Sequence, residues 1–409
     1  MSKEKRRVPK LRFPGFTEDW EQRKLGDYLS IPEREVLEVK SANDLLTVKL
    51  NLGGVELGAN RDTLSLGSTV YYKRYAGQFI YGKQNFFNGS MGIISQNLDG
   101  KGSSGDVPSF NILNIETNYL YTYVSRESYW RPKVAAASGT GSKRIHEKTL
   151  LDFNIDVPSI NEQKLISNTF DLINRFITLN QRKLDNLKLK KKALLQKLFP
   201  KNGERYPELR FPGFTDAWEQ RKLGDVIASL YNGQTPSRFD KANWEGDIPW
   251  LTSGELNRGV VNHSIEKITQ QGRDDANLKI VPKGTVVIAI TGLEAAGTRG
   301  NCAKLGFDTT LNQSCMAIYP KSEFLDPDFL FQWYIAVGEE YGIKYTQGTK
   351  QQSYNAELIK ILPISVPRVT EQRKITRILD LFDDIITLHQ RKLDHLQLQK
   401  KALLQQMFV

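Results

Sequence analysis

The sequence repeats itself, and this repeat constrains the fold more than any other feature. Residues 11–27, LRFPGFTEDWEQRKLGD, recur at residues 209–225 as LRFPGFTDAWEQRKLGD, with 15 of 17 positions identical. A second pair of segments, residues 161–200 and 370–409, shares 22 of 40 positions. Self-similarity of this kind decides the architecture before any local pattern does. We therefore expect the repeated segments to form the same structure in each half of the chain.

The middle segments of the two halves differ from each other. Residues 28–138 and residues 226–347 show no identity comparable with that of their flanks. Two copies of one surface usually face two copies of one partner, or each other, whereas two unrelated inserts need not bind the same ligand. We interpret the inserts as two different readers. The alternative is an old gene duplication in which the inserts drifted, but drift should have eroded the flanks as well.

Each half ends in a segment whose apolar residues follow a seven-residue period, which predicts a long helix with a coiled-coil seam. In the first copy, the two seam series are Ile166, Ile173, Leu187 and Leu194, and Phe170, Ile177, Leu184 and Leu198. In the second copy, they are Ile375, Phe382, Leu396 and Leu403, and Leu379, Ile386, Leu393 and Met407. The pattern and the duplication together favour an antiparallel pair of helices with pseudo-two-fold symmetry.

Both seams are interrupted at matching places. Asn180 and Lys191 break the first seam, and His389 and Lys400 break the second. Polar seam residues usually specify the register or the pairing of coiled coils. The start of the first helix also has the spacing of a capping box, because Ser159 is followed three residues later by a glutamate.

The chain has 57 basic and 46 acidic residues, and its net charge of +11 favours an acidic partner such as nucleic acid. Most of this charge lies on the two predicted helices (+6 and +2) and in the first ten residues (+4). The rest of the chain, which includes the two middle segments and which we call the two lobes, is therefore nearly neutral. The run Lys190–Lys192 is either a solvated helix face or a stripe that faces phosphates. Bulk charge alone therefore does not identify the lobes as DNA readers.

The cysteine content and hydropathy narrow the class of protein. Two cysteines, Cys302 and Cys315, cannot frame a disulfide scaffold of this size, and we expect both to be reduced and structural. The sequence has no run of about 18 apolar residues, and its basic N-terminus leads into no apolar signal core. We therefore expect a soluble, cytoplasmic protein without membrane contact.

Both lobes mix short β-like runs, such as residues 69–80, 284–290 and 315–319, with turns rich in glycine and asparagine, which predicts mixed α/β lobes. In the first lobe, basic and amide side chains interleave with aromatic ones. Such groups suit bases and phosphates. The DNA-binding candidates here are Lys73, Arg74, Tyr75, Lys83, Gln84 and Asn85. The alternative is a strand with buried aromatics on one face and charges on the other.

Two glycine-bearing loops, residues 138–144 and 347–353, occupy matching places before the last predicted strand of each lobe. Glycine lets a backbone approach a ligand closely, and hydroxyl, amide and basic groups can contact phosphates or base edges. The candidates are Thr140, Ser142, Lys143 and Arg144 in the first lobe, and Thr349, Lys350, Gln351, Gln352, Arg258, Arg299 and Asn301 in the second. The alternative is a pair of ordinary surface turns. The first loop lacks P-loop spacing, so no ATP site is predicted.

The sequence contains no visible catalytic motif. Its four histidines are scattered, and no metal-binding spacing such as H-E-x-x-H or C-x-x-C occurs. The G-x-S-x-G elbow, the dinucleotide fingerprint and the N-P-P or D-P-P motif of adenine amino-methyltransferases are also missing. We therefore expect a non-catalytic protein without a metal site. The alternative is a nuclease-like cluster of carboxylates that only the fold assembles.

Several motifs occur in a fixed order along the chain. W-x-x-x-x-L-G-D occurs at Trp20–Asp27 and Trp218–Asp225, I-P-W-L at Ile248–Leu251, and V-P-x-x-x-E-Q at Val157–Gln163 and Val366–Gln372. With a long helix after each V-P-x-x-x-E-Q motif, this set resembles the specificity subunit of type I restriction-modification systems. The resemblance covers nearly the whole chain.

The resemblance implies an α+β chain in which two target-recognition domains each read one half of an asymmetric, bipartite DNA target. It also implies that two long helices form an antiparallel coiled coil that fixes the spacer between the half-sites. The expected segments are a basic tail (1–10), the first target-recognition domain (11–158), the first helix (159–200), a linker (201–208), the second target-recognition domain (209–367) and the second helix (368–409).

The resemblance further implies that the chain binds double-stranded DNA as part of a complex. Two methyltransferase subunits are expected to dock on it and to methylate adenine with S-adenosylmethionine. Restriction subunits are expected to add ATP- and Mg²⁺-dependent translocation and cleavage. The chain itself is expected to bind no cofactor.

Three other functions compete with this one. A stand-alone, sequence-specific DNA-binding regulator would share the bipartite design without needing a methyltransferase. A scaffold whose lobes bind protein would show no salt-dependent DNA binding. A fused nuclease or methyltransferase is disfavoured by the missing motifs.

Overall fold

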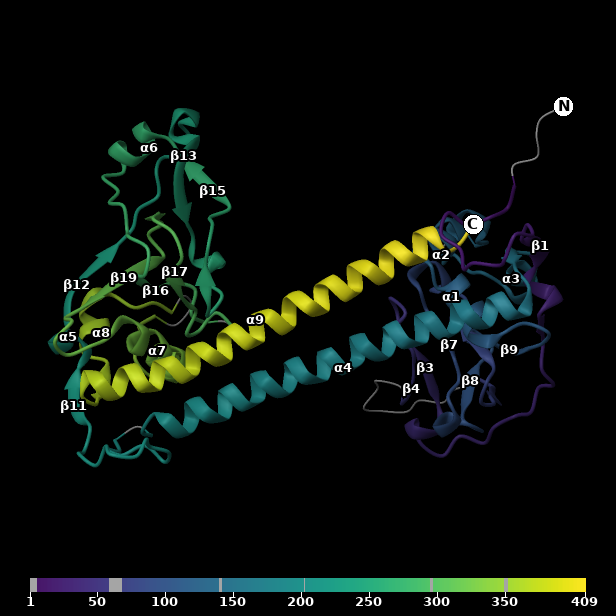
Figure 1. Cartoon of the computed structure of the whole chain (residues 1–409), viewed down its shortest axis with the longest axis horizontal. Helices are drawn as coiled ribbons and strands as arrows, with labels where there is room; N and C mark the ends of the chain where they lie inside the picture. The colour runs from purple at the N-terminus through teal and green to yellow at the C-terminus, as the bar shows by residue number, and fades with distance from the viewer. Residues whose placement is uncertain (1–5, 59–67, 140–141, 202, 295–296, 349–351) are drawn as a thin grey trace. The chain divides into compact units, whose positions relative to one another are not determined.

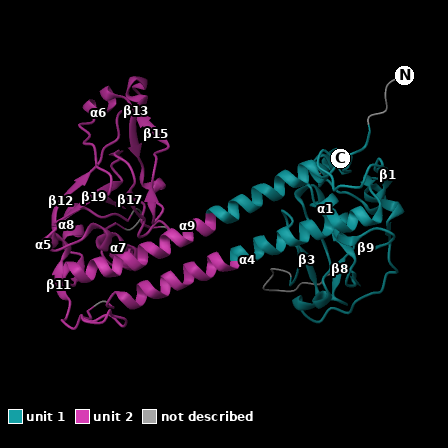
Figure 2. Cartoon of the chain, in the orientation of Figure 1, with its two compact units in different colours: residues 1–181, 391–409 teal, residues 182–390 magenta. Residues whose placement is uncertain are grey.

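The computed structural model of the chain (Figure 1) describes residues 6–58, 68–139, 142–201, 203–294, 297–348 and 352–409. The chain forms two compact units, one of residues 1–181 with 391–409 and one of residues 182–390 (Figure 2). Two long helices, α4 (Ile160–Leu198) and α9 (Val369–Gln406), each contribute to both units. Each unit therefore contains parts of both halves of the repeat.

The first unit is built around a four-stranded antiparallel sheet with the strand order β2-β9-β6-β7. Its strands are β2 (Leu29–Ser30), β6 (Phe79–Tyr81), β7 (Met91–Ile93) and β9 (Ser109–Ile112). Three two-stranded sheets pair β1 (Glu21–Lys24) with β10 (Asn154–Val157), β3 (Leu46–Val48) with β4 (Val55–Leu57), and β5 (Tyr71–Lys73) with β8 (Gly102–Ser104). The short helices are α1 (Thr117–Val124), α2 (Glu127–Trp130) and α3 (Glu147–Leu151).

The second unit has a different sheet. Five strands run in the order β12 (Ile227–Asn232), β19 (Cys315–Pro320), β16 (Val286–Ala289), β17 (Cys302–Leu305) and β14 (Val260–Val261). A three-stranded sheet has the order β15 (Glu266–Ile268), β13 (Trp244–Leu251) and β18 (Thr310–Leu311), and β11 (Glu219–Lys222) pairs with β20 (Pro363–Val366). The other helices are α5 (Leu223–Val226), α6 (Gln270–Asp275), α7 (Pro327–Lys344) and α8 (Ala356–Lys360). The two lobes thus differ in topology as well as in sequence.

The cores of the two units also differ. The core of the first unit is aromatic: Tyr81 stacks on Phe110 with ring centroids 6.1 Å apart, and Trp20 joins the same core. The core of the second unit is centred on the buried aliphatic strand β16. Cys302 and Cys315 are free and buried there, and burial raises the pKa of the Cys302 thiol to about 12. These thiols are therefore protonated core residues.

In both units, the repeated segment pairs with the last strand of the lobe and binds the start of a long helix; we call this arrangement the joint. Strand β1 pairs with β10 so that Glu21 faces Val157, and β11 pairs with β20 so that Glu219 faces Val366. These partners occupy equivalent positions in the two copies of the repeat. The repeated sequence therefore encodes one strand register twice.

A buried ion pair holds each repeated segment on a long helix. Arg12 donates two hydrogen bonds, 2.8 and 2.9 Å long, to the carboxylate of Glu162 at the start of α4. Arg210 makes the same two contacts with Glu371 at the start of α9, also at 2.8 and 2.9 Å. The carboxylates are 1% and 2% exposed, so both charges depend on their arginine partners.

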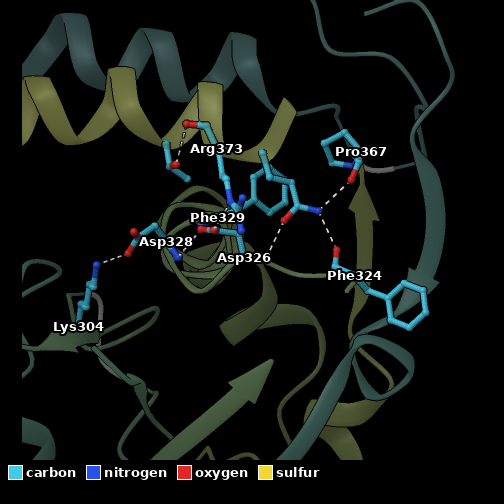
Figure 3. Close-up of polar contacts among 9 residues, drawn as sticks. Lys304, Phe324, Asp326, Asp328, Phe329, Pro367 and Arg373 are labelled. Atoms are coloured by element: carbon cyan, nitrogen blue, oxygen red, sulfur yellow. Dashed lines mark hydrogen bonds and ion pairs between the residues drawn. The ribbon is translucent and has the colours of Figure 1, made fainter. Parts of the chain in front are cut away.

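The glutamine that follows each of these glutamates binds the lobe. In the second unit, the Gln372 amide donates to the carbonyls of Phe324 and Pro367, both at 2.8 Å, and accepts from the backbone N–H of Asp326 at 2.8 Å (Figure 3). Asp326 also caps α7 and pairs with Arg373 of α9 at 3.4 Å. The repeated Glu-Gln dipeptide thus connects the repeated segment, the helix and the lobe.

The first unit uses its glutamine in the same way. Gln163 donates to the carbonyl of Pro158 at 2.9 Å and accepts from the backbone N–H of Glu116 at 2.9 Å. Glu116 caps α1 and also accepts a hydrogen bond from Ser167 of α4. Although the capping residue differs between the two units, the contact to its backbone is the same.

Within each unit, the two long helices meet through their seam residues. In the first unit, Ile166 and Phe170 of α4 share the core with Met407 and Phe408, which follow α9. In the second unit, the last turns of α4 share the core with the first turns of α9, through Leu195, Leu198, Ile375 and Leu379. Every predicted seam position, the four polar ones included, is buried or half-buried.

The predicted lysine run is divided between two environments. The Lys191 ammonium is buried in the second unit, where it lies 2.6 and 2.7 Å from the two carboxylate oxygens of Asp383. Gln332 of α7 donates to the same carboxylate at 3.2 Å. Lys190 and Lys192 are exposed. Of this run, only Lys190 and Lys192 can therefore form part of a solvated helix face or of a stripe that faces phosphates.

Two local predictions need correction. The backbone N–H of Glu162 donates to Ser159 Oγ at 3.4 Å, but the Glu162 side chain binds Arg12 and does not complete a capping box. The run 69–80 forms two strands, β5 and β6, because a turn at residues 74–78 interrupts it.

Candidate nucleic-acid interface

The two glycine-bearing loops form the same hairpin. Ser138 and Arg144 exchange two backbone hydrogen bonds of 3.0 and 2.9 Å, and Gln347 and Ser353 exchange two of 3.0 Å each. Gly139 has φ +115°, and a Cβ there would lie 2.5 Å from the carbonyl oxygen of Ser142. A residue with a side chain would therefore strain this turn. The two hairpins share one closure but differ in the side chains between the closing residues.

Some of the candidates are exposed on these hairpins, whereas others lie outside the described residues. Ser142 and Lys143 are exposed, and Gln352 is half-buried. The candidates that lie outside the described residues are Thr140, Thr349, Lys350 and Gln351.

In the first lobe, the hairpin adjoins a second candidate segment. The backbone N–H of Ile145 donates to the carbonyl of Lys83 at 2.9 Å, and Arg144 pairs with Asp106 at 3.0 Å. The Lys83 ammonium lies 2.9 Å from the carboxylate of Glu147. Lys83 and Arg144 thus lie in one region, although they are far apart in sequence.

The neighbouring candidates Gln84 and Asn85 differ in exposure. Gln84 is exposed, whereas Asn85 is half-buried and accepts a hydrogen bond from the Asn88 amide at 3.2 Å. Asn85 therefore supports a turn of the backbone in addition to any contact with a ligand.

Lys73, Arg74 and Tyr75 do not form one exposed row. Lys73 and Tyr75 both bind the carboxylate of Glu35, and these contacts lower the pKa of Glu35, the Lys73 hydrogen bond most strongly. Arg74 is only 5% exposed, and its guanidinium donates to Ser103 Oγ at 2.7 Å. Sequence analysis did not foresee its burial, because the polar residues on both sides indicate a surface.

In the second lobe, the candidates come together around the second hairpin. The Arg299 guanidinium donates to the carbonyls of Leu293 and Glu294, each at 2.8 Å, and Arg258 donates to the Arg299 carbonyl. The backbone N–H of Gln352 donates to the Glu294 carboxylate at 3.2 Å. Arg258 is exposed and Arg299 half-buried, so the Arg258 side chain is the more accessible cation of the two.

Asn301 has a different place in the second lobe. Its backbone N–H donates to Thr298 at 3.2 Å, and its carbonyl accepts from Ala289 of β16 at 2.8 Å. The residue is half-buried. These contacts tie Asn301 to the edge of the main sheet beside Arg299.

The sequence did not single out Arg34 or Glu147, which line a pocket with Tyr72 and Arg74 in the first lobe. No repeat or motif marks Arg34, which lies in an irregular segment between two short strands. Only the folded contacts show that these residues belong together.

The described residues contain neither a metal-binding cluster nor a helix that could span a membrane. No group of three or more histidine, cysteine, aspartate or glutamate side chains there is arranged to hold a metal ion. Within the same part of the chain, no helix combines the length and the apolar character needed to span a membrane.

Comparison with known proteins identifies the family. The model of the type I restriction modification DNA specificity domain matches residues 17–189 and 215–398. The chain is 28% identical over 172 residues to the type I restriction enzyme MjaIX specificity subunit of Methanocaldococcus jannaschii, covering 41% of this chain and 38% of that protein. It is also 28% identical over 170 residues to the EcoR124I/EcoR124II specificity subunit of Escherichia coli, covering 41% of each. The chain thus spans about two fifths of the length of these curated relatives.

A solved structure has the same fold over the whole chain. The S subunit of a type I restriction-modification system from M. genitalium matches 98% of this chain and 99% of its own, with 15% identity and a TM-score of 0.61. The family model covers the strand pairs β1–β10 and β11–β20 and both lobes. On this evidence, the protein belongs to the type I restriction-modification DNA specificity family.

Proposed function

We propose that this chain is the DNA-specificity subunit of a type I restriction-modification complex and has no catalytic site of its own. Each lobe reads one half of an asymmetric, bipartite target in double-stranded DNA. The observation that carries this proposal is the combination of one repeated joint with two unlike lobes. Identical joints present both lobes in the same way, whereas different sheets and loops can select different bases.

The hairpins 138–144 and 347–353 are the first elements to which we assign base reading. Phosphate contacts position a protein on DNA, and contacts to base edges give the specificity. The residues inside the two closures read GTGSK and GTKQQ, so two loops with the same closing hydrogen bonds carry two different sets of donors and acceptors. This difference supports two different half-sites.

We assign the spacer to an antiparallel coiled coil of α4 and α9. The heptad seams and the cores that the two helices share within each unit support this assignment. A continuous helix of 39 residues, the length of α4, is about 58 Å long. A rod of this length can separate two half-sites by about one turn of the DNA helix or slightly more.

Repeated exposed leucines support the docking of two methyltransferase subunits on the helices. The residues Leu172, Leu179 and Leu189 of α4 correspond to Leu381, Leu388 and Leu398 of α9 in the repeat, and all six are 49–67% exposed. Large apolar side chains repeated on the outside of a polar helix are typical of a binding surface. Methyltransferase subunits would bring S-adenosylmethionine, and restriction subunits would bring ATP and Mg²⁺.

The experiment that tests this function is a methylome. The chain is expressed with the methyltransferase subunit of its own genome in a host without DNA methylation, and the modified bases are mapped by sequencing. We expect an asymmetric, two-part motif that is methylated only when this chain is present. Methylation in the absence of the chain, or a stable complex that methylates nothing, would contradict the proposal. A stand-alone regulator would instead bind such a motif without any methyltransferase.

A further inference from the structure

Arg74 carries a buried charge whose hydrogen bonds go to neutral groups. Among the described residues, it takes part in no ion pair, and its side chain lies in a lobe where it is 5% exposed. Its guanidinium donates only to neutral groups: Ser103 Oγ at 2.7 Å, Ser109 Oγ at 3.5 Å, and the carbonyls of Ser104 and Val107 at 3.4 Å. Buried charges in proteins are normally paired. Arg74 thus has neutral hydrogen-bond partners but no ion-pair partner among the described residues.

The surrounding hydrogen bonds keep this arrangement in place. Ser103 Oγ donates to the carbonyl of Val107, and Ser109 Oγ donates to Gln78 Oε1 at 2.7 Å. Because both hydroxyl protons are used elsewhere, both oxygens accept from Arg74. Burial, followed by the nearby charge of Arg34, lowers the pKa of Arg74 to about 10, so the guanidinium still carries its proton at neutral pH.

A small open pocket reaches Arg74 from the surface. The ring of Tyr72 is close to two guanidinium groups, with its centroid 5.5 Å from Arg34 Cζ and 5.7 Å from Arg74 Cζ. Both distances are within the range of a cation–π contact. The rim includes Gly105, where an added Cβ would meet no atom within 4 Å, so no side chain covers the opening at this point.

Positive charge exceeds negative charge around this pocket. Glu147 is the lining carboxylate, and it lies 2.9 Å from the Lys83 ammonium and 3.8 Å from Arg34. Three cationic side chains, Arg34, Arg74 and Lys83, thus lie in the same region as one carboxylate. Glu147 pairs with Lys83 and Arg34 and also interacts favourably with Arg74, so the region keeps an excess of positive charge.

We infer that one phosphate oxygen of the DNA backbone, beside the half-site read by the first lobe, enters this pocket, whose volume of about 20 Å³ admits a single water-sized atom. The inference rests on the proposed function and deepens it. Guanidinium groups match the geometry of phosphate oxygens. The pocket also adjoins the first hairpin, because Arg144 pairs with Asp106 next to the rim residue Gly105. A phosphate held here would fix the position of the hairpin over its bases.

Methylphosphonate substitution tests the inference on the assembled complex. The full chain with its methyltransferase subunits is bound to a duplex that carries the methylated motif. Single phosphates in and beside the half-sites are replaced by neutral methylphosphonates, and affinity is measured by fluorescence anisotropy at several salt concentrations. The variants are Arg34→Ala and Arg74→Gln. The matched control is Arg131→Ala, which removes an exposed arginine of the same lobe that pairs with Glu127 at 2.6 Å.

For the wild type, we expect one methylphosphonate position to weaken binding about tenfold, the lower range for a hydrogen bond to a charged group. The slope of log affinity against log salt should also fall by about 0.9 there, the value for one phosphate. Arg34→Ala should weaken binding to the natural duplex and remove the sensitivity at that position. Arg131→Ala should retain the sensitivity at that position. If circular dichroism shows that Arg74→Gln is unfolded, the binding measurements on Arg34→Ala, at an exposed position, decide the test.

Two results would overturn the phosphate site while leaving the proposed function intact. One is specific binding by the wild type with no sensitive position, or with a position that stays equally sensitive in Arg34→Ala. The other is a variant that loses its methyltransferase subunit but not the phosphate sensitivity, which would assign the pocket to an acidic protein segment. A wild-type complex without sequence-specific binding would overturn both the site and the function.

Discussion

Removing the arginine of a buried joint should destabilise one unit and spare the other. In Arg12→Met, the carboxylate of Glu162 stays 1% exposed and loses both of its charged hydrogen bonds. Breaking a buried ion pair by removing one partner costs about 3–5 kcal/mol. For units of roughly 200 residues, 1 kcal/mol corresponds to about 2–4 °C. We therefore expect calorimetry to show the melting transition of the first unit lowered by about 10 °C.

Two comparisons make this prediction specific. Arg210→Met should lower the transition of the second unit instead, because Arg210 and Glu371 repeat the same geometry. Arg23→Met, which removes an exposed partner of Glu21, should leave both transitions unchanged. In Arg12→Met with Glu162→Gln, the loss should be smaller than the sum of the single losses, because no charge remains buried. An Arg12→Met chain that melts like the Arg23 control would refute the reasoning.

Three further predictions concern function. One heptad can be inserted after Gln181 and another after Gln390, at the boundaries between the two units. Each insertion lengthens its helix by about 10.5 Å and preserves the seam register. A methylome of this variant should show the same half-sites with a spacer about three base pairs longer. Replacing residues 139–143 by the sequence of residues 348–352 should change one half-site in the methylome and leave the spacer unchanged. Leu172→Glu, at a 54% exposed position, should weaken methyltransferase binding at least tenfold in analytical ultracentrifugation without lowering the melting temperature.

The parts of the fold that depend on periodicity could be predicted from the sequence. Heptad spacing indicates α4 and α9 almost to their ends, since a helix repeats its faces every few residues. The two hairpins could be located because they lie at matching places beside glycines. The partnership of Arg12 with Glu162 could not be predicted, because the two residues are 150 positions apart and no local pattern connects them.

The candidate site was predictable only in part. Lys83 was recognised as a basic residue among aromatic ones and Arg144 as part of a glycine-bearing loop, but only the fold shows that they lie in one region. Arg74 was recognised by its charge and misjudged in its exposure, because burial of an arginine depends on the serines that surround it in space. Arg34 was missed altogether, since its importance comes from the ring of Tyr72 beside it.

The way in which each glutamine of the joint holds its lobe bears on how such proteins acquire new specificities. Gln163 and Gln372 hold the lobes through the backbone N–H groups of Glu116 and Asp326, and every residue except proline supplies a backbone N–H. A recombination event that exchanged the middle of one half would therefore bring in a foreign lobe without disturbing the contacts that seat it. The repeated ends offer long stretches of similar sequence where such crossovers can occur. One joint could thus serve a succession of unrelated lobes over evolutionary time.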